Sequence, residues 1–394
     1  MNLFCRLCAI SCSLALSACS SMLQEPSQPA RAPLGLVVAT QYAVANPSKT
    51  GTLLYWLSAR TDTVLTRSAD SLPRNTLAVR LGKSAHEVVF IGFTASTRQF
   101  ALYDLAAQHR IMSVAQSTPL LVPDAANPSA LWSVEISGNA GIAFAEHSGV
   151  VLLGAHTTGF VEQGLLAIDV ATFRALWFLR GHDIVALSSL SDGGDRIWIA
   201  QRHVGGVFGQ YGSVLVFNTL TQKVVDSVTF PARTAPEIYP YSFTEIESSD
   251  HPSTFAVTAG FVFVCGGAAL ACRPTQIPGS GVIARRDSVP KFLQLVGSEI
   301  GRNGNPPGLR LLANDGTVTR SFTVPELAAN YAGGVFGTLL SSPPIAVLTY
   351  GSDYLAGAPG ERGAVSLFSL GSGQIIWSAR LDSLGIQPGL VFAR

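Results

Sequence analysis

A pattern of three short apolar strands recurs along this chain, and it limits the possible folds more than any other feature of the sequence. In each copy an apolar strand ends near glycine or alanine. A loop then leads to another glycine and a second strand, and a tight polar turn leads to a third strand. Three copies align without gaps across that turn, within residues 150–177, 197–226 and 354–377. Such self-similarity is typical of folds in which each unit packs against a like neighbour.

The aligned positions share their chemistry. A short polar residue ends the second strand in the three copies, at Asp169, Asn218 and Ser369. A branched apolar residue recurs early in the third strand, at Leu176, Val225 and Ile376. A fourth segment around Tyr103 and Asp104 fits the same register. Short polar turns between alternating apolar strands predict antiparallel hairpins.

These hairpins predict an all-β fold, a β-propeller that occupies residues 34–394. Closure of a ring of sheets leaves only short, protected strand edges. Seven first-strand anchors predict seven blades, and they fall near residues 37, 89, 151, 198, 256, 293 and 354. The alternatives are paired β-sandwiches, which a single repeated pattern argues against, and a β-helix, whose coils are shorter than these units.

Parts of the repeat resemble known propeller families. The segment 355–368 resembles the FG-GAP repeat of integrin-type propellers, and the loop 191–195 is similar to a shortened calcium loop of that repeat. The turns that lead to Trp177 and Trp377 resemble those of quinoprotein repeats. Each resemblance covers one or two units. It therefore implies the architecture and neither family's function.

The N-terminal residues 1–19 carry an export signal. A single arginine precedes a short apolar stretch that is too short to span a bilayer comfortably, as in a signal peptide. The motif Leu-Ser-Ala-Cys at residues 16–19 resembles the lipobox of bacterial lipoproteins. This resemblance implies acylation of Cys19, and Ser20 after it implies sorting to the outer membrane. The alternative is an ordinary secretory signal that is cut elsewhere.

Residues 20–33 are rich in proline, serine and glutamine, and we expect a flexible tether there. Two or three acyl chains anchor a protein stably, so we expect outer-membrane lipid as one partner through Cys19. Only two of the six cysteines, Cys265 and Cys272, lie in the body of the chain. Export to an oxidising compartment predicts a disulfide between them, and two free thiols are the alternative.

Few groups in the body of the chain suggest chemistry. Charged residues make up 13% of the sequence and the formal net charge is +1, so there is no electrostatic footprint for nucleic acid. Asp192 and Asp195 could bind calcium, although aspartates beside glycines make equally good turns. Asn314 and Asp315 form a second pair that could bind calcium or make a turn. Three histidines near strand ends could converge on one face for metal binding or catalysis, His156, His182 and His203.

Because no zinc motif or nucleophile elbow is present, the sequence favours a non-enzymatic binding or scaffold module for a protein or an envelope polymer. The alternative is a propeller enzyme, a hydrolase, lyase or quinoprotein, with its site at the channel mouth. The long segments 201–211 and 231–252 could build such a site. Fold alone does not decide between the two.

Overall fold

The protein was analysed as a computed structural model, which describes residues 37–42, 52–58, 63–67, 72, 75–81, 87–94, 97–137, 141–189, 195–205, 209–230, 245–248, 255–258, 262–266, 271–274, 282–285, 291–296, 308–313, 317–324, 339–341, 344–350, 364–380 and 388–393. The regular elements among these residues are all β-strands. The described residues contain no helix long and apolar enough to cross a membrane. The expected signal peptide and tether lie outside the described residues.

The described strands form seven antiparallel sheets, which we number in chain order. Sheet 1 contains β30 (Pro388–Ala393), β1 (Val37–Tyr42), β2 (Thr52–Ser58) and β3 (Thr63–Arg67). Sheet 2 contains β4 (Asn75–Arg80), β5 (Glu87–Phe93), β6 (Thr97–Asp104) and β7 (His109–Ser117). Sheet 3 contains β10 (Ile142–Ala145), β11 (Val150–Thr157), β12 (Gln163–Asp169) and β13 (Ala175–Arg180), with an added hairpin of β8 (Leu120–Pro123) and β9 (Leu131–Ile136).

The other four sheets have four strands each. Sheet 4 contains β14 (Ile184–Ser189), β15 (Arg196–Gly205), β16 (Gly209–Asn218) and β17 (Lys223–Phe230). Sheet 5 contains β18 (Glu245–Ser248), β19 (Phe255–Thr258), β20 (Val262–Gly266) and β21 (Ala271–Pro274). Sheet 6 contains β22 (Val282–Arg285), β23 (Lys291–Val296), β24 (Gly308–Leu312) and β25 (Val318–Thr323). Sheet 7 contains β26 (Leu339–Ser341), β27 (Pro344–Tyr350), β28 (Ala364–Ser369) and β29 (Gln374–Arg380).

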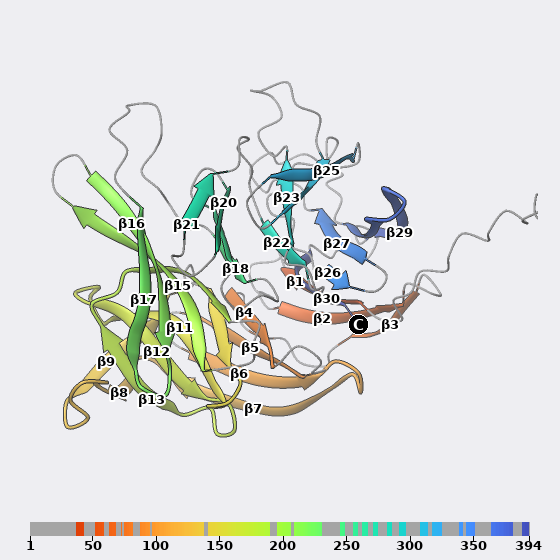
Figure 1. The fold of residues 1–394 in the computed structure, drawn as a ribbon. Coiled ribbons are helices and arrows are strands. Elements are labelled where there is room, and N and C mark those ends of the chain that lie inside the picture. The colour runs from red at the N-terminus through yellow and green to blue at the C-terminus, as the bar shows by residue number, and fades with distance from the viewer. Residues whose placement is uncertain are drawn as a thin grey trace, which may run out of the picture.

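The sheets follow one another around a ring (Figure 1). The first strands of neighbouring sheets are in contact, β4 with β10, β10 with β14, β14 with β18, β18 with β22 and β22 with β26. The ring closes because β1 pairs with both β2 and the C-terminal strand β30. This is the β-propeller that the repeat predicted. Each sheet buries its faces against its neighbours, as between sheets 3 and 4, where Leu152 and Leu165 pack with Ile197 and Phe217.

The predicted three-strand unit omits one strand of each sheet. The anchors at residues 37, 89, 151, 198, 256 and 293 lie in the second strand of their sheets, counted outward from the ring centre. The anchor near residue 354 lies outside the described residues. On its inner side β28 pairs with β27, which ends at Tyr350, earlier than we expected. The innermost strands were missed because they lack the polar turn that marks the other strands.

The repeated polar turn has a common geometry. The side chain of the first residue accepts a hydrogen bond from the amide three residues later, in the pairs Asp104–Ala107, Asp169–Thr172, Asn218–Thr221 and Ser369–Ser372. The residue after that amide has a positive φ, at Gln108, Phe173, Gln222 and Gly373. The register then shifts so that one residue of the outer strand lacks a cross-strand partner, namely Ile111, Leu176, Val225 or Ile376. Such β-bulges protect exposed strand edges from pairing with other chains.

Glycine is required for steric reasons at the start of the second predicted strand. A Cβ on Gly164 would lie 2.0 Å from the carbonyl oxygen of Leu179, and one on Gly308 would lie 2.0 Å from that of Phe322. Both glycines lie at the start of the third strand of a sheet, Gly164 as the second residue of β12 and Gly308 as the first of β24, where the outermost strand lies close. A side chain at either position would therefore push the backbones of two paired strands apart.

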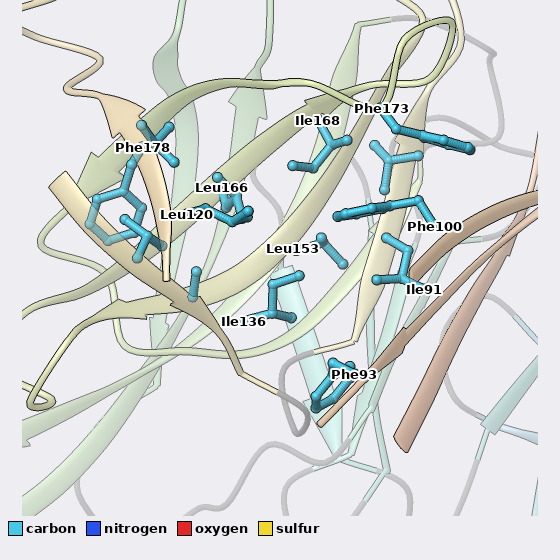
Figure 2. Close-up of a cluster of buried hydrophobic side chains, with 14 of the residues drawn as sticks. Ile91, Phe93, Phe100, Leu120, Ile136, Leu153, Leu166, Ile168, Phe173 and Phe178 are labelled. Carbon is cyan, nitrogen blue, oxygen red and sulfur yellow. The ribbon is translucent and has the colours of Figure 1, made fainter. Parts of the chain in front are cut away.

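The hairpin of β8 and β9 extends sheet 3. It lies between sheets 2 and 3 and fills their shared core with Leu120, Val122, Val134 and Ile136. Figure 2 shows Leu120 and Ile136 beside Leu153 and Leu166 of sheet 3, with Ile91 and Phe100 of sheet 2 nearby. Burial of such side chains contributes roughly 1.5–3 kcal/mol each, so the hairpin is an integral part of the core.

Candidate functional site

The hairpin of β8 and β9 builds a distinct structure at one end of sheet 3. Along β11 the neighbouring strand changes: β10 pairs with residues 150–153, and β9 pairs with residues 155–157. At the far side of the hairpin, Asp124 forms a bridge to Phe178 of β13. The hairpin thus connects both sides of sheet 3 at this end, which we call the insertion end.

A buried carboxylate fastens the hairpin to β13. Asp124 is 4% exposed and accepts hydrogen bonds from Trp132 Nε1 at 2.7 Å, from Arg180 Nε at 2.8 Å and from two backbone amides. The Arg180 guanidinium also lies 4.4 Å from the centre of the Trp132 ring. Burial raises the pKa of Asp124, but the hydrogen bonds from Trp132, the amides of Ala126 and Asn127, and Arg180 together lower it below its usual value.

Hydrogen bonds also fix the turn between β11 and β12. Thr157 donates its amide to Glu162 O at 2.8 Å, and its hydroxyl accepts the Glu162 amide at 3.0 Å. Ser133 of β9 is joined to Thr158 by a hydroxyl contact of 2.8 Å and accepts the Thr158 amide on its carbonyl at 2.9 Å. These bonds place the turn and the outer face of the hairpin side by side.

Phe160 projects from this turn in an unusual conformation. Its φ is 59°, in the left-handed region that bulky residues rarely adopt. One face of its ring stacks on His156, with 3.8 Å between ring centroids and 22° between planes. The side chain is nevertheless 70% exposed, so its other face is open to solvent.

Four strongly exposed apolar side chains lie at the insertion end. Leu121 is 70% exposed, Leu131 is 62%, Phe160 is 70% and Val161 is 80%. Leu121 and Leu131 alternate with the buried hairpin residues, so they lie on the same outer face as Ser133, which bonds to the turn. We call these four residues the apolar tip. Exposed apolar patches are a common feature of interaction sites in proteins.

A row of polar residues crosses the base of the tip. Glu135, His156 and Gln163 are direct cross-strand partners, so their side chains share one face of sheet 3. His182 donates its amide to Gln163 O, and its Nδ1 lies 2.8 Å from Gln201 Oε1. Gln201 Nε2 donates to Ser213 Oγ at 2.9 Å. The side chains of His182, Gln201 and Ser213 therefore form a hydrogen-bonded chain, which the His182 amide joins to the backbone of Gln163 in sheet 3.

Arg98 of β6 is the polar group whose environment is least compensated. It is 3% exposed, and within the described part of the chain its Nε and Nη1 atoms have no hydrogen-bond partner. Burial lowers the pKa of Arg98, and the charge of Glu135 opposes that shift. Because buried guanidinium nitrogens without acceptors are unfavourable, we expect this side chain to lower the stability of the fold.

The structure brings together only some of the residues that the sequence singled out. His156 is a cross-strand partner of Gln163 and His182 bonds to the backbone of Gln163, but the His156 ring stacks on Phe160 and the His182 ring contacts Gln201. His203 lies in β15 near the same end, and its side chain is outside the described residues. Asp195 is buried, its carbonyl accepts the Thr219 hydroxyl at 2.9 Å, and its carboxylate lies 3.6 Å from His147. Asp192 is outside the described residues, which contain no group of three metal-ligating side chains.

The two cysteines of the chain body lie on neighbouring strands. The register makes Cys265 of β20 and Cys272 of β21 direct cross-strand partners. Direct partners in antiparallel strands have Cα atoms about 4.5–5.5 Å apart, which lies within the range that a disulfide requires. The disulfide stays a prediction.

Sequence reasoning missed the apolar tip and the Asp124 cluster. The local signal was the run from Gly159 to Val161, where two large apolar residues follow a glycine inside a polar turn. The bond between Arg180 and Asp124 joins residues 56 positions apart, so no local pattern could indicate it.

These features define the protein as a β-propeller with an inserted hairpin. No family model and no curated protein matches the chain in sequence. In fold it is similar to a functionally unknown protein from Desulfotomaculum acetoxidans, with 10% identity, a TM-score of 0.53 and coverage of 91% of this chain and 98% of that one. The chain is also similar in fold to apo AztD from Citrobacter koseri, with 9% identity, a TM-score of 0.50 and coverage of 91% of this chain and 97% of that one. For the β-propeller domain of the Trilobed protease from Pyrococcus furiosus, the identity is 11%, the TM-score is 0.45, and the match covers 77% of this chain and 83% of that one. Identities this low concern the fold alone.

Proposed function

We propose that this chain is a lipid-anchored, non-enzymatic binding module of the bacterial outer membrane, and that a partner docks at the insertion end. The observation that carries the proposal is a contrast at this end between polar side chains that bond within the protein and apolar side chains that are exposed. Two polar pairs there are bonded internally, Asp124 with Arg180 and His182 with Gln201. The apolar tip stays exposed. Catalysis needs polar groups that reach a substrate, whereas docking uses exposed apolar anchors.

The insertion end can be tested by charge substitution in the full-length protein. We expect the double variant Leu121→Glu/Leu131→Glu to lose a specific partner that is crosslinked to the wild type in intact envelopes. The matched control is Leu220→Glu, because Leu220 is 67% exposed but lies in the turn between β16 and β17, away from the hairpin. Equal recovery of the partner by both variants would contradict the proposed surface. Turnover of an envelope polymer by the purified double variant would support the enzyme alternative instead.

The membrane anchor is tested separately. We expect the mature protein to begin at Cys19 with an acylated thiol, and the Cys19→Ala variant to leave the membrane fraction. Mass spectrometry of the N-terminal peptide and detergent-phase partition measure these outcomes. A mature N-terminus at any other residue would leave the binding module without its proposed anchor.

Export also predicts the oxidation state of the body cysteines. We expect non-reducing peptide mapping to find Cys265 and Cys272 in one crosslinked species, and reduction to separate them. The closed loop is short, so reduction should lower the free energy of unfolding by about 2–3 kcal/mol. Free thiols in protein isolated from the envelope would contradict this prediction.

A further inference from the structure

We infer that the partner at the insertion end is a protein that packs an apolar side chain against Phe160 and brings a lysine or arginine to Glu162. This inference rests on the proposed function, and it goes further by naming the chemistry of the partner. Three observations support it: a rigid exposed aromatic ring, an aliphatic surround and one uncompensated carboxylate.

Phe160 has the properties of an interface anchor. The hydrogen bonds of Thr157 and Thr158 hold its turn, and the ring rests on His156. A ring that is already ordered loses little conformational entropy when a partner covers it, and such aromatic residues dominate binding energy. Its left-handed backbone is unfavourable for a bulky residue, and strain of this kind clusters at functional sites.

The other side chains of the apolar tip favour a protein over a polysaccharide as the partner. Val161, Leu121 and Leu131 present aliphatic groups, which offer no hydrogen bonds to sugar hydroxyls. Hydroxyls covered by these side chains would lose their bonds to water without replacement. An apolar segment of a protein can be buried on the same surface without that loss.

The negative charge of Glu162 at the apolar tip indicates which residue should lie beside the partner's apolar segment. Glu162 follows Val161 directly, and within the described part of the chain its carboxylate has no ion pair or side-chain hydrogen bond. Of the other acidic residues nearby, Asp124 is paired with Arg180, and the charge of Glu135 acts on that of Arg98. A cation on the partner would therefore meet its counter-charge at Glu162.

Site-specific photocrosslinking in cells tests the inference. A photoreactive amino acid replaces Val161 in the full-length lipoprotein, and the same amino acid at Leu220 serves as the control. We expect a protein adduct at position 161 only, mapped to a partner peptide in which apolar residues adjoin a lysine or arginine. Glu162→Gln should lower the adduct yield about two- to fivefold, and Phe160→Ala at least about tenfold. Phe160→Leu, which keeps an apolar contact, should lower it less.

The other outcomes overturn the inference in distinguishable ways. A lipid adduct, a second copy of this chain, or equal adducts at positions 161 and 220 would each exclude the stated partner. If Leu121→Glu/Leu131→Glu abolishes partner recovery while the mapped peptide is acidic or polar, the binding module stands and only this partner class falls. Thermal unfolding of every variant separates loss of contact from loss of fold.

Discussion

Phe160 stacks directly on His156, and this contact leaves His156 only 7% exposed although it lies near the end of a strand at the surface. The imidazole Nδ1 lies 3.2 Å from the carbonyl oxygen of Thr157. The exposed ring thus has two roles, as a cover for the histidine and as the open face that a partner would meet.

Phe160→Ala should uncover His156. We expect the rate of His156 modification by diethyl pyrocarbonate to rise severalfold, because solvent reaches the ring that Phe160 covers. Stability should change little, since such an aromatic pair contributes about 0.5–1.5 kcal/mol. Peptide mass spectrometry measures the modification. Val161→Ala is the control, because Val161 is exposed beside the stack, and an equal rise in both variants would argue against the cover.

Asp124→Ala should loosen the hairpin. The carboxylate is buried and accepts bonds from Trp132, Arg180 and two amides, so its loss should lower the free energy of unfolding by about 2–3 kcal/mol. Urea denaturation measures the change. The control is Asp169→Ala, where the lost bonds lie in an exposed turn and the loss should be smaller. Equal losses would show that the buried cluster adds nothing beyond a turn cap.

The contribution of Asp124 should depend on pH in a defined direction. Its pKa is lower in the folded protein than in the unfolded chain, so folding favours the ionised form. The stabilisation is therefore present above the unfolded pKa and disappears as the pH falls through the folded pKa, below about pH 4. The stability difference between wild type and Asp124→Asn should be constant from pH 5 to 7 and shrink in more acidic solution. A difference that grows on acidification would reverse the assigned sign.

Arg98→Met should stabilise the protein. The substitution removes a buried guanidinium with two unpartnered nitrogen atoms and keeps an apolar chain of similar length. We expect the free energy of unfolding to rise by about 1–3 kcal/mol. Arg174→Met, at an exposed position, should have little effect. A loss of stability in Arg98→Met would mean that the guanidinium has an acceptor in solution.

Gly164→Ala should be strongly destabilising. The added Cβ would lie 2.0 Å from the Leu179 carbonyl oxygen, a backbone atom that cannot move without breaking the pairing of β12 and β13. We expect a loss of more than about 2 kcal/mol. Gly371→Ala is the matched control, because its Cβ would meet only the Ser369 hydroxyl at 3.6 Å. Similar midpoints of thermal unfolding for the two variants would contradict the steric argument.

Much of the fold could be predicted from local sequence. The turns at Asp169, Asn218 and Ser369 were recognised by alignment, and each has the same side-chain bond in the structure. A convergence of histidines on one face was raised as a possibility, but the rings of His156 and His182 contact different residues, Phe160 and Gln201. The apolar tip was not predicted, because Leu121 and Leu131 look like ordinary strand residues until one face of their hairpin is seen to be buried.

The sequence by itself determined the outer part of the repeated unit, with its polar turn, since turn chemistry and strand alternation depend on residues a few positions apart. Only the tertiary structure decided where the hairpin of β8 and β9 lies. Its place depends on Asp124 meeting Arg180 and on Ser133 meeting Thr158, which are 56 and 25 residues apart. Contacts over such separations leave no local pattern in the sequence, and they help to position the hairpin beside the turn that carries Phe160.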